Sequence, residues 1–338
     1  MTIGVVTSAP PGVEGGHLVI ARALAGALRR LGHDAEVLTT PDYGFGQLTR
    51  TYRAALATDV RRFDQVISFR YPSFAVAHPR HTCWLNHTMR EYYDLWPRFA
   101  ASISWRNRVK EGIRGAILRR ADAYLLRRVT RVVAQSKTIQ ARTARDFGIS
   151  ADVVYPPAPL DGYRCDEYGD YVFAVSRLEP LKRLDLLVRA LAEAPARHVR
   201  AVVAGDGEQA SALRALAAQR GVADRVSFVG RIDDRALLTH YARCRAVCFT
   251  PYAEDYGFVT IEAFASAKAV ITCRDSGGPA ELVEDEVTGV VCEATPASLA
   301  IALARLVDDR ARAERLGAAA AARAARITWQ DAVARLLL

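Results

Sequence analysis

Two glutamates, Glu254 and Glu262, stand with seven residues between them, and a glycine, Gly257, lies in that interval. A strand-like stretch at 246–250 precedes the pair, and a helix of small residues is expected from Glu262 onward. Two acids this close would repel each other and would be costly to desolvate in a core. A helix N-terminus between them offers unpaired N–H groups and a partial positive charge, which suit a phosphate. Because the acids could then hold hydroxyls on either side, the pattern predicts a nucleotide-sugar site.

Two further loops could complete that site. Arg177 and Lys182 follow the expected strand 171–175, and both could reach an anionic diphosphate, although two solvated loop cations are the alternative. Gly277 and Gly278 are expected to present backbone N–H groups at the start of another helix. These loops therefore predict an anion-binding edge on one sheet.

A glycine-bearing loop also follows the first expected strand. It contains Gly15 and Gly16, which would allow a backbone to approach a phosphate or a sugar closely. The loop has neither the Gly-x-Gly-x-x-Gly pattern nor the Gly-Lys-Ser/Thr of a P-loop. An ordinary turn explains it equally well.

Strand and helix signals alternate along the whole chain, which predicts crossover connections and parallel sheets. Prolines at 156–159 interrupt the alternation, so a domain boundary is expected there. The predicted fold class is α/β, with two doubly wound Rossmann-like domains whose parallel sheets face each other across a cleft. The expected strands are 3–7, 35–39, 65–69, 82–86, 131–134, 153–155, 171–175, 199–204, 226–229, 246–249 and 270–272.

Composition agrees with two globular domains. The chain has 338 residues, of which 51% are hydrophobic and 25% charged, as is usual for a soluble protein. Neither an apolar run of about 20 residues nor a signal peptide is recognised, so a cytoplasmic location is expected. Its 6 cysteines are scattered, which favours reduced thiols over a disulfide framework or a zinc site.

The net charge of +9 is concentrated in residues 105–131. A basic amphipathic helix is expected there, with Val109, Ile113, Ile117, Leu118 and Leu125 forming part of its apolar stripe. Three interpretations compete: a solvated basic face, peripheral contact with anionic lipid at the inner face of the membrane, and nucleic-acid binding. Nucleic acid is disfavoured because no groove-reading motif accompanies the charge.

Taken together, these motifs resemble the retaining family 4 glycosyltransferases, which have the GT-B fold. The resemblance rests on Arg177 with Lys182, on the spacing of Glu254 and Glu262, and on the run 277–281. It extends over nearly the whole chain. It implies an acceptor-binding domain at 1–160, a donor-binding domain at 161–317, and a helical segment at 318–338 that packs back on the first domain.

The resemblance also implies roles for individual residues. Arg177 and Lys182 would bind the donor diphosphate, Glu254 the hydroxyls of the donor sugar, and Glu262 the ribose. The implied donor-binding set is Gly15, Gly16, Arg177, Lys182, Glu254, Tyr256, Gly257, Phe258, Val259 and Glu262.

On the acceptor side, the histidine that follows strand 82–86 is His87, and it would lie near the reacting carbon. A hydrogen-bonded loop histidine is the alternative, and His17 and His78 are lesser candidates. Trp84 and Tyr92 could stack on an acceptor or belong to the core.

The implied reaction moves a hexosyl group from a nucleotide sugar, of the GDP-mannose or UDP-glucose type, to a hydroxyl of a sugar, a lipid-linked sugar or a small aglycone. The run 254–257 is closer to relatives that use GDP-mannose. Fixed cations and helix N–H groups can stabilise the leaving diphosphate. Because the chain has no Asp-x-Asp pair, neither metal nor another cofactor is expected. The family often has Lys-Gly where this chain has Lys182-Arg183. The end of the site that binds the diphosphate is therefore expected to be more cationic.

Two other classes compete with a transferase. A non-catalytic nucleotide-sugar binder, or a degenerate partner subunit, would keep the same donor-side residues. A dinucleotide oxidoreductase is disfavoured because the first strand-to-helix turn lacks the Gly-x-Gly-x-x-Gly pattern.

Overall fold

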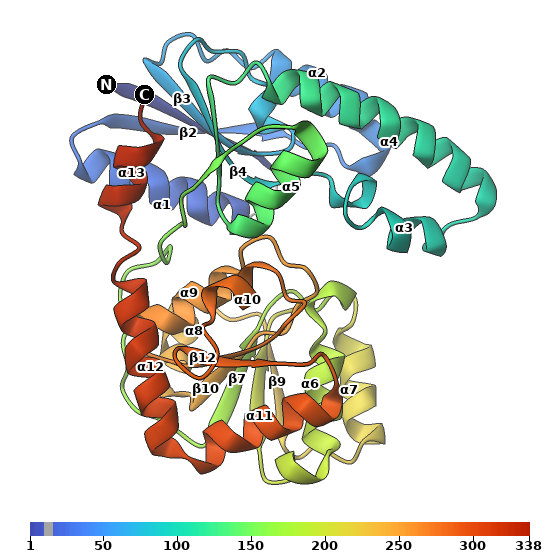
Figure 1. Ribbon diagram of the computed structural model, residues 1–338, viewed down its shortest axis with the longest axis vertical. Coiled ribbons are helices and arrows are strands. Elements are labelled where there is room, and N and C mark those ends of the chain that lie inside the picture. Colours follow the sequence, from blue (N-terminus) through green and yellow to red (C-terminus); the bar gives the residue numbers. More distant parts are fainter. Residues whose placement is uncertain (10–15) are drawn as a thin grey trace. The chain divides into compact units, whose positions relative to one another are not determined.

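A computed structural model describes residues 1–9 and 16–338. They form two compact units, one made of Met1–Pro159 with Thr328–Leu338 and the other of Leu160–Ile327. Each unit contains a six-stranded sheet in which every paired strand is parallel (Figure 1). The predicted α/β class with two parallel-sheet domains is therefore confirmed.

The sheet of the first unit has the strand order β2-β1-β3-β4-β5-β6. Its central strands are almost continuously buried, as expected where helices cover both faces of a parallel sheet. Its strands are β1 Thr2–Ala9, β2 Asp34–Pro41, β3 Gln65–Arg70, β4 His81–His87, β5 Arg131–Ala134 and β6 Asp152–Val153.

Helices of the first unit begin and end at recognisable residues. Ser136 caps α5 by accepting a hydrogen bond from the Ile139 amide, and Gly148 ends it in the left-handed conformation. Ser104 caps α4 in the same way through the Asn107 amide. The helices are α1 Gly16–Arg30, α2 Leu48–Leu56, α3 Trp96–Ser102, α4 Trp105–Leu126 and α5 Lys137–Phe147, with short 3₁₀ turns η1 Phe45–Gln47, η2 Ser73–Ala75 and η3 Arg90–Tyr92.

The sheet of the second unit has the strand order β12-β11-β10-β7-β8-β9. The order reverses between β7 and β10, and these neighbours pair through Val172 with Ala246 and Phe173 with Val247. Loops that leave two such strands diverge to opposite faces of the sheet, which opens a crevice at their carboxyl ends. The strands are β7 Tyr171–Val175, β8 Arg200–Ala204, β9 Val226–Gly230, β10 Ala246–Cys248, β11 Val270–Cys273 and β12 Gly289–Cys292.

Helices of the second unit pack on the sheet through buried apolar side chains. Leu187 of α6 and Leu303 of α11 are fully buried against strand residues such as Ile271. The helices are α6 Leu184–Ala192, α7 Ala210–Gln219, α8 Asp234–Arg243, α9 Phe258–Ala265, α10 Gly278–Leu282, α11 Pro296–Asp308 and α12 Arg310–Ala324, with 3₁₀ turns η4 Pro180–Lys182 and η5 Ala194–Ala196.

The chain returns to the first unit through α13, Trp329–Leu336, which packs beside α1 (Figure 1). The carbonyl of Leu336 accepts hydrogen bonds of 3.0 Å from Gln65 Nε2 and from Thr82 Oγ1. The ring of Trp329 meets Trp84 edge to face at 6.3 Å. The segment expected as one helix over 318–338 is thus divided, because α12 ends at Ala324 before α13 begins.

Candidate functional site

The candidate site of the second unit lies where the strand order reverses. The loop after β7 runs through 176–183 and contains η4, and the loop after β10 runs through 249–257 into α9. The loops touch, since the Tyr252 amide donates to the Leu181 carbonyl at 2.7 Å. These two loops therefore carry Arg177, Lys182, Glu254 and Gly257.

Lys182 and Glu254 form an ion pair across these two loops. The Lys182 ammonium donates to the Glu254 carboxylate oxygens Oε1 at 2.8 Å and Oε2 at 2.7 Å. Their side chains are 13% and 20% exposed, so the pair is partly shielded from water but still open to a ligand. The sequence pattern predicts separate roles for the two residues and does not predict this contact, because 72 positions separate them along the chain.

Arg183 shapes the site instead of adding charge to it. Its backbone has φ 51°, a left-handed conformation that suits glycine. Its guanidinium donates to the carbonyls of Thr250 and Pro251 at 2.8 and 2.7 Å and to both oxygens of Asp275. The expectation of a more cationic diphosphate end is therefore wrong, since this positive charge is already neutralised and holds the two loops together.

Arg177 pairs with another residue of its own loop. Its side chain is 74% exposed, and its guanidinium lies 2.6 Å from Glu179 in the same loop. The structure therefore does not bring Arg177 together with Lys182 and Glu254. Its diphosphate role stays a prediction that requires the side chain to turn.

The start of α9 presents backbone N–H groups beside this pair. Gly257 is the N-cap, with φ 80°, and no side chain caps the helix, so the first N–H groups, from Phe258 and Val259, lack intrahelical acceptors. A Cβ atom at Gly257 would lie 2.7 Å from Pro279 Cγ, so only glycine fits. Tyr256, just before it, is buried edge to face against Phe258 at 5.2 Å.

Gly277 and Gly278 have a different role from the one expected. The Gly278 amide donates to the Glu254 carbonyl at 2.9 Å, and the Glu254 amide donates to the Ser276 carbonyl at 2.8 Å. A Cβ atom at Gly277 would lie 2.4 Å from the Glu254 carbonyl oxygen. These glycines allow close packing that fixes the Glu254 backbone, and the Gly278 N–H is not available for a phosphate.

Glu262 lies inside the second unit, in the second turn of α9. Its Oε2 accepts a 2.7 Å hydrogen bond from the hydroxyl of Tyr241 on α8. Burial raises the pKa of the Glu262 carboxyl, although the hydrogen bond from Tyr241 opposes the shift. The structure thus places Glu262 in a buried position of α9, with a hydroxyl partner already in contact.

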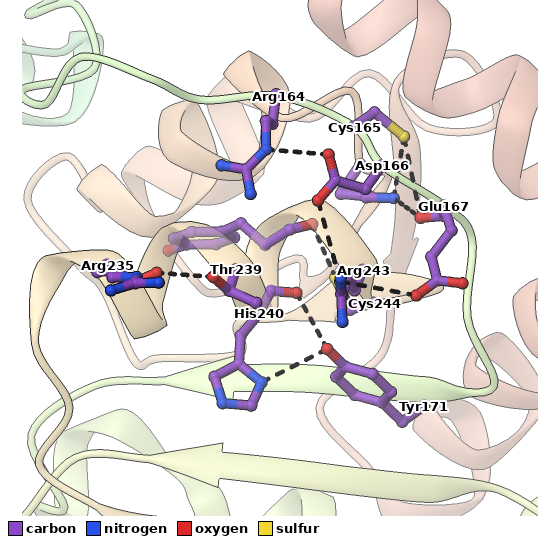
Figure 2. Close-up of polar contacts among 12 residues, drawn as sticks. Arg164, Cys165, Asp166, Glu167, Tyr171, Arg235, Thr239, His240, Arg243 and Cys244 are labelled. Carbon is purple, nitrogen blue, oxygen red and sulfur yellow. Dashed lines mark hydrogen bonds and ion pairs between the residues drawn. The ribbon is translucent and has the colours of Figure 1, made fainter.

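Polar contacts attach α8 to the segment that enters the second unit (Figure 2). Arg243, the last residue of α8, lies 3.9 Å from both Asp166 and Glu167, and Arg164 pairs with Asp166 at 2.9 Å. These partners are exposed, so each pair stabilises the fold only weakly. Together they fix the end of the helix that presents Tyr241 to Glu262.

The structure describes the candidate site residues of the first unit only in part. Gly15 lies outside the described residues, and Gly16 is the first residue of α1. His87 ends β4, at the carboxyl edge of the sheet, and its carbonyl accepts from the Tyr71 amide at 3.1 Å. This is the edge at which ligands bind in doubly wound sheets, so the acceptor role of His87 stays a prediction.

Two aromatic residues expected near an acceptor belong to the core. Trp84 is fully buried and donates its indole N–H to the Val154 carbonyl at 2.8 Å. Tyr92 is also fully buried, stacks on Phe45, and donates to Glu111 at 2.5 Å. Neither ring can reach an acceptor from these positions, so both are better explained by packing.

His78 and His81 are not placed for chemistry either. His78 precedes β4, at the amino edge of the sheet, and both ring nitrogens lie near carbonyl oxygens, of Arg80 and Phe63. His81 is buried against Ser68, and burial lowers its pKa to about 4. For His17 the structure describes only the backbone, within α1.

The cysteines and the helices give two further findings. Four of the six cysteines are buried and Cys292 is half-buried, whereas Cys165 is exposed. Within residues 1–9 and 16–338, no cluster of three His, Cys, Asp or Glu side chains could hold a metal ion. In the same residues, no helix combines the length and the apolar character required to cross a membrane.

Comparison with known families decides the nature of the second unit. Residues 164–323 match the model of the family described as "Glycosyl transferases group 1". These residues form a glycosyltransferase group 1 domain. The domain includes Arg177, Lys182, Glu254 and Glu262, so the resemblance of these motifs to the group 1 glycosyltransferases is confirmed.

Two similar curated proteins extend the comparison. The D-inositol 3-phosphate glycosyltransferase of Nocardia farcinica is 32% identical over 238 residues, which cover 61% of this chain and 52% of that protein. The GDP-mannose-dependent alpha-(1-6)-phosphatidylinositol monomannoside mannosyltransferase of Mycobacterium tuberculosis H37Rv is 34% identical over 210 residues, 54% of each chain. The chain thus spans about half the length of these curated relatives.

Two solved structures share the fold. HepE of Anabaena, crystallised in complex with UDP-glucose, aligns with a TM-score of 0.70 at 20% identity and covers 98% of both chains. WaaG, a glycosyltransferase involved in lipopolysaccharide biosynthesis, aligns with a TM-score of 0.72 at 15% identity over 99% of both chains. The predicted GT-B fold class is therefore confirmed for the glycosyltransferase domain and the unit that accompanies it.

Proposed function

We propose that the chain is a retaining glycosyltransferase that moves a hexosyl group from a nucleotide-diphosphate sugar to a hydroxyl acceptor. The observation that carries the proposal is the ion pair of Lys182 and Glu254 beside the uncapped start of α9. A cation, a carboxylate and free N–H groups gather at the reversal point of a parallel sheet within a glycosyltransferase group 1 domain.

In this proposal each group binds one part of the donor. The Lys182 ammonium and the N–H groups of Phe258 and Val259 bind the diphosphate, since all of them favour negative charge. Glu254 accepts hydrogen bonds from sugar hydroxyls, and Glu262 accepts them from the ribose. Arg177, the exposed cation of the same loop, adds a second positive charge when the diphosphate is present.

The proposed reaction breaks the bond between the sugar C1 and the diphosphate oxygen. A bond from the acceptor oxygen to C1 forms on the same face, and the acceptor's proton passes to the leaving phosphate. The main task of the protein is then to stabilise the charge that develops on the diphosphate. Lys182 and the start of α9 supply fixed positive charge for that purpose, so we propose that no metal ion is required.

The donor and the acceptor are proposed by class. GDP-mannose is the first donor to test, because the Mycobacterium tuberculosis relative is named for it and the run 254–257 favours it. UDP-glucose is the second, since HepE was crystallised with it. Both curated relatives carry an inositol compound in their names, so inositol phosphates and mannosylated phosphatidylinositol belong in the acceptor panel. His87 is the proposed acceptor-side residue.

The decisive experiment incubates the full chain with each nucleotide sugar, with and without acceptors and with and without a chelator. We expect release of GDP or UDP that increases with the correct acceptor, persists in the chelator, and yields a product with the donor's anomeric configuration. Binding without release in every combination would make the chain a nucleotide-sugar binder. Tight NAD binding would instead favour an oxidoreductase.

A further inference from the structure

The outer face of α4 in the first unit is apolar. Trp105, Val109, Ile113, Ile117 and Tyr124 are between 59% and 70% exposed. The first four recur every four residues, so they follow one another along one side of the helix. Figure 1 shows α4 extending from the sheet of its unit, with α3 beside its N-terminal end. Of the apolar stripe expected from the sequence, Val109, Ile113 and Ile117 therefore face solvent, whereas Leu118 is buried in the core.

The inner face of α4 is held by polar groups as well as by the buried Leu118 and Leu126. Glu111 accepts a 2.5 Å hydrogen bond from Tyr92, and Asp122 accepts hydrogen bonds from Tyr93, at 2.6 Å, and from Tyr52. Over residues 105–126, all of which the structure describes, these are the acidic residues, and both are buried. The negative charges of the helix are therefore turned inward.

Positive charges remain on the outer side, between the apolar residues. Arg106, Lys110 and Arg120 are exposed, and at 100° per residue they fall on the same half of the helix as the apolar stripe. The guanidinium of Arg106 lies 5.4 Å from the centre of the Trp105 ring. The exposed half of α4 thus alternates hydrophobic and cationic side chains, a combination that suits neither plain solvent nor a protein core.

A groove runs beside this face. It has a volume of about 650 Å³ and lies between α4 and residues 46–52. Ile113 and Ile117 give it an apolar wall, and Arg50, Lys110 and Arg114 place cations around it. Such a groove can accept an apolar chain while the cations bind an anionic group.

We propose that the outer face of α4 docks on the surface of an anionic lipid bilayer. The apolar side chains would enter the boundary between headgroups and acyl chains, and the interleaved cations would bind lipid phosphates. A second copy of the chain is a poorer occupant, because pairing two such faces would oppose cation to cation. Nucleic acid is also poorer, because a phosphate backbone gives an aliphatic stripe nothing to contact. The proposal does not depend on the proposed function, since docking requires neither donor nor turnover.

The test measures binding of the full chain to vesicles of phosphatidylcholine alone and of phosphatidylcholine mixed with phosphatidylglycerol. We expect binding at least about tenfold tighter to the anionic vesicles, with loss of most of that preference at high salt. The double variant Ile113→Ser/Ile117→Ser should lose most vesicle binding without touching the core, and the triple variant Arg106→Gln/Lys110→Gln/Arg120→Gln should lose the preference for anionic lipid. Ile301→Ser, on α11 of the second unit and 46% exposed, is the matched control that should bind as wild type.

Each alternative outcome contradicts the proposal. Equal affinity for both vesicle types, or undiminished binding by Ile113→Ser/Ile117→Ser, would overturn it. A dimer in analytical ultracentrifugation that the same double variant dissociates would assign the face to a second copy instead. Thermal unfolding of each variant should match wild type, because the substituted side chains are exposed, and the shift in Trp105 fluorescence on adding vesicles, measured against Trp105→Phe, reports insertion at the face itself.

Discussion

The Lys182 ammonium donates to both oxygens of the Glu254 carboxylate, at 2.8 and 2.7 Å, and so joins the loops on either side of the reversal point. Each charge is the other's partner while no donor is present. A diphosphate would compete for the ammonium, and sugar hydroxyls would compete for the carboxylate. Removing one residue therefore also leaves the other partly buried charge unpaired, which determines how variants of this pair should behave.

Replacing Lys182 by alanine should affect both binding and chemistry. Lys182→Ala removes a fixed positive charge from the proposed diphosphate position, so kcat/KM with the donor should fall by about 10²–10³-fold. Calorimetry should also show weaker binding of GDP or UDP. Arg200→Ala is the control, because Arg200 begins β8 at the amino edge of the same sheet, where its exposed side chain pairs only loosely with Asp170. Turnover near wild type in Lys182→Ala would remove the diphosphate assignment.

Replacing Glu254 by glutamine should separate the sugar from the nucleotide. Glu254→Gln keeps the shape of the side chain but removes the negative charge of the group that accepts hydrogen bonds from the sugar hydroxyls. The value of kcat should therefore fall by about 10–100-fold. The affinity for free GDP or UDP should stay within about threefold of wild type or become tighter, because the diphosphate then no longer competes with the Glu254 carboxylate for Lys182. Titration calorimetry and donor turnover measured on the same preparation test this. If both fell together, Glu254 would belong to the nucleotide side.

The backbone at Arg183 predicts an order of stability for two variants. Arg183→Ala and Arg183→Gly both lose the hydrogen bonds to Thr250, Pro251 and Asp275, so both should be less stable than wild type. Since φ is 51°, alanine bears a steric cost that glycine avoids. The free energy of unfolding in urea should therefore be about 1 kcal/mol lower for alanine than for glycine. Equal values would show that the backbone relaxes at this position.

Most of the second unit could be predicted because its strands are short continuous apolar runs between helices. The loop residues were harder to assign. Gly277 and Gly278 have the composition of an anion-binding turn, but their function is to pack against Glu254, and only the three-dimensional contact distinguishes the two cases. Arg183 occupies a position where the family resemblance implies glycine, and its positive φ is a backbone conformation that favours glycine.

For helix α4, the sequence alone does not predict which side of the helix is buried. Its sequence contains apolar residues and acids at helical spacing, and the usual rule places the apolar ones inside. The tyrosines that pair with Glu111 and Asp122 come from other segments, 19 to 70 residues away, so their partners could not be read from the helix itself. Trp84 could have been assigned correctly, because it lies in the middle of a strand that is buried on both faces.

Asp122 should make stability depend on pH in an identifiable way. Burial raises its pKa from 3.8 to about 6, so between these values the unfolded chain has lost the proton that the folded chain still holds. The contribution of Asp122 to the free energy of unfolding therefore falls by up to about 3 kcal/mol as the pH rises from about 4 to 6. Above about pH 6 it is constant. In Asp122→Asn the side chain does not titrate. The free energy of unfolding of this variant minus that of wild type should therefore increase as the pH rises from about 4 to 6.

The measurement for Asp122 is urea unfolding of both proteins at a series of pH values. His81 also titrates in this range, with its pKa lowered to about 4, but it is present in both proteins and cancels in the difference. A difference that stays constant from about pH 4 to pH 7 would show that Asp122 is ionised in the folded state.

The return of α13 to the first unit has a consequence for how the protein can be made and divided. Gln65 and Thr82, in the interior of the first sheet, rely on the Leu336 carbonyl as an acceptor. A fragment ending at residue 159 would leave both groups without it, at a cost of about 1–3 kcal/mol each. On the ribosome, the part of the protein synthesised first would likewise wait for the part synthesised last, so its folding is completed only after the intervening unit has been translated.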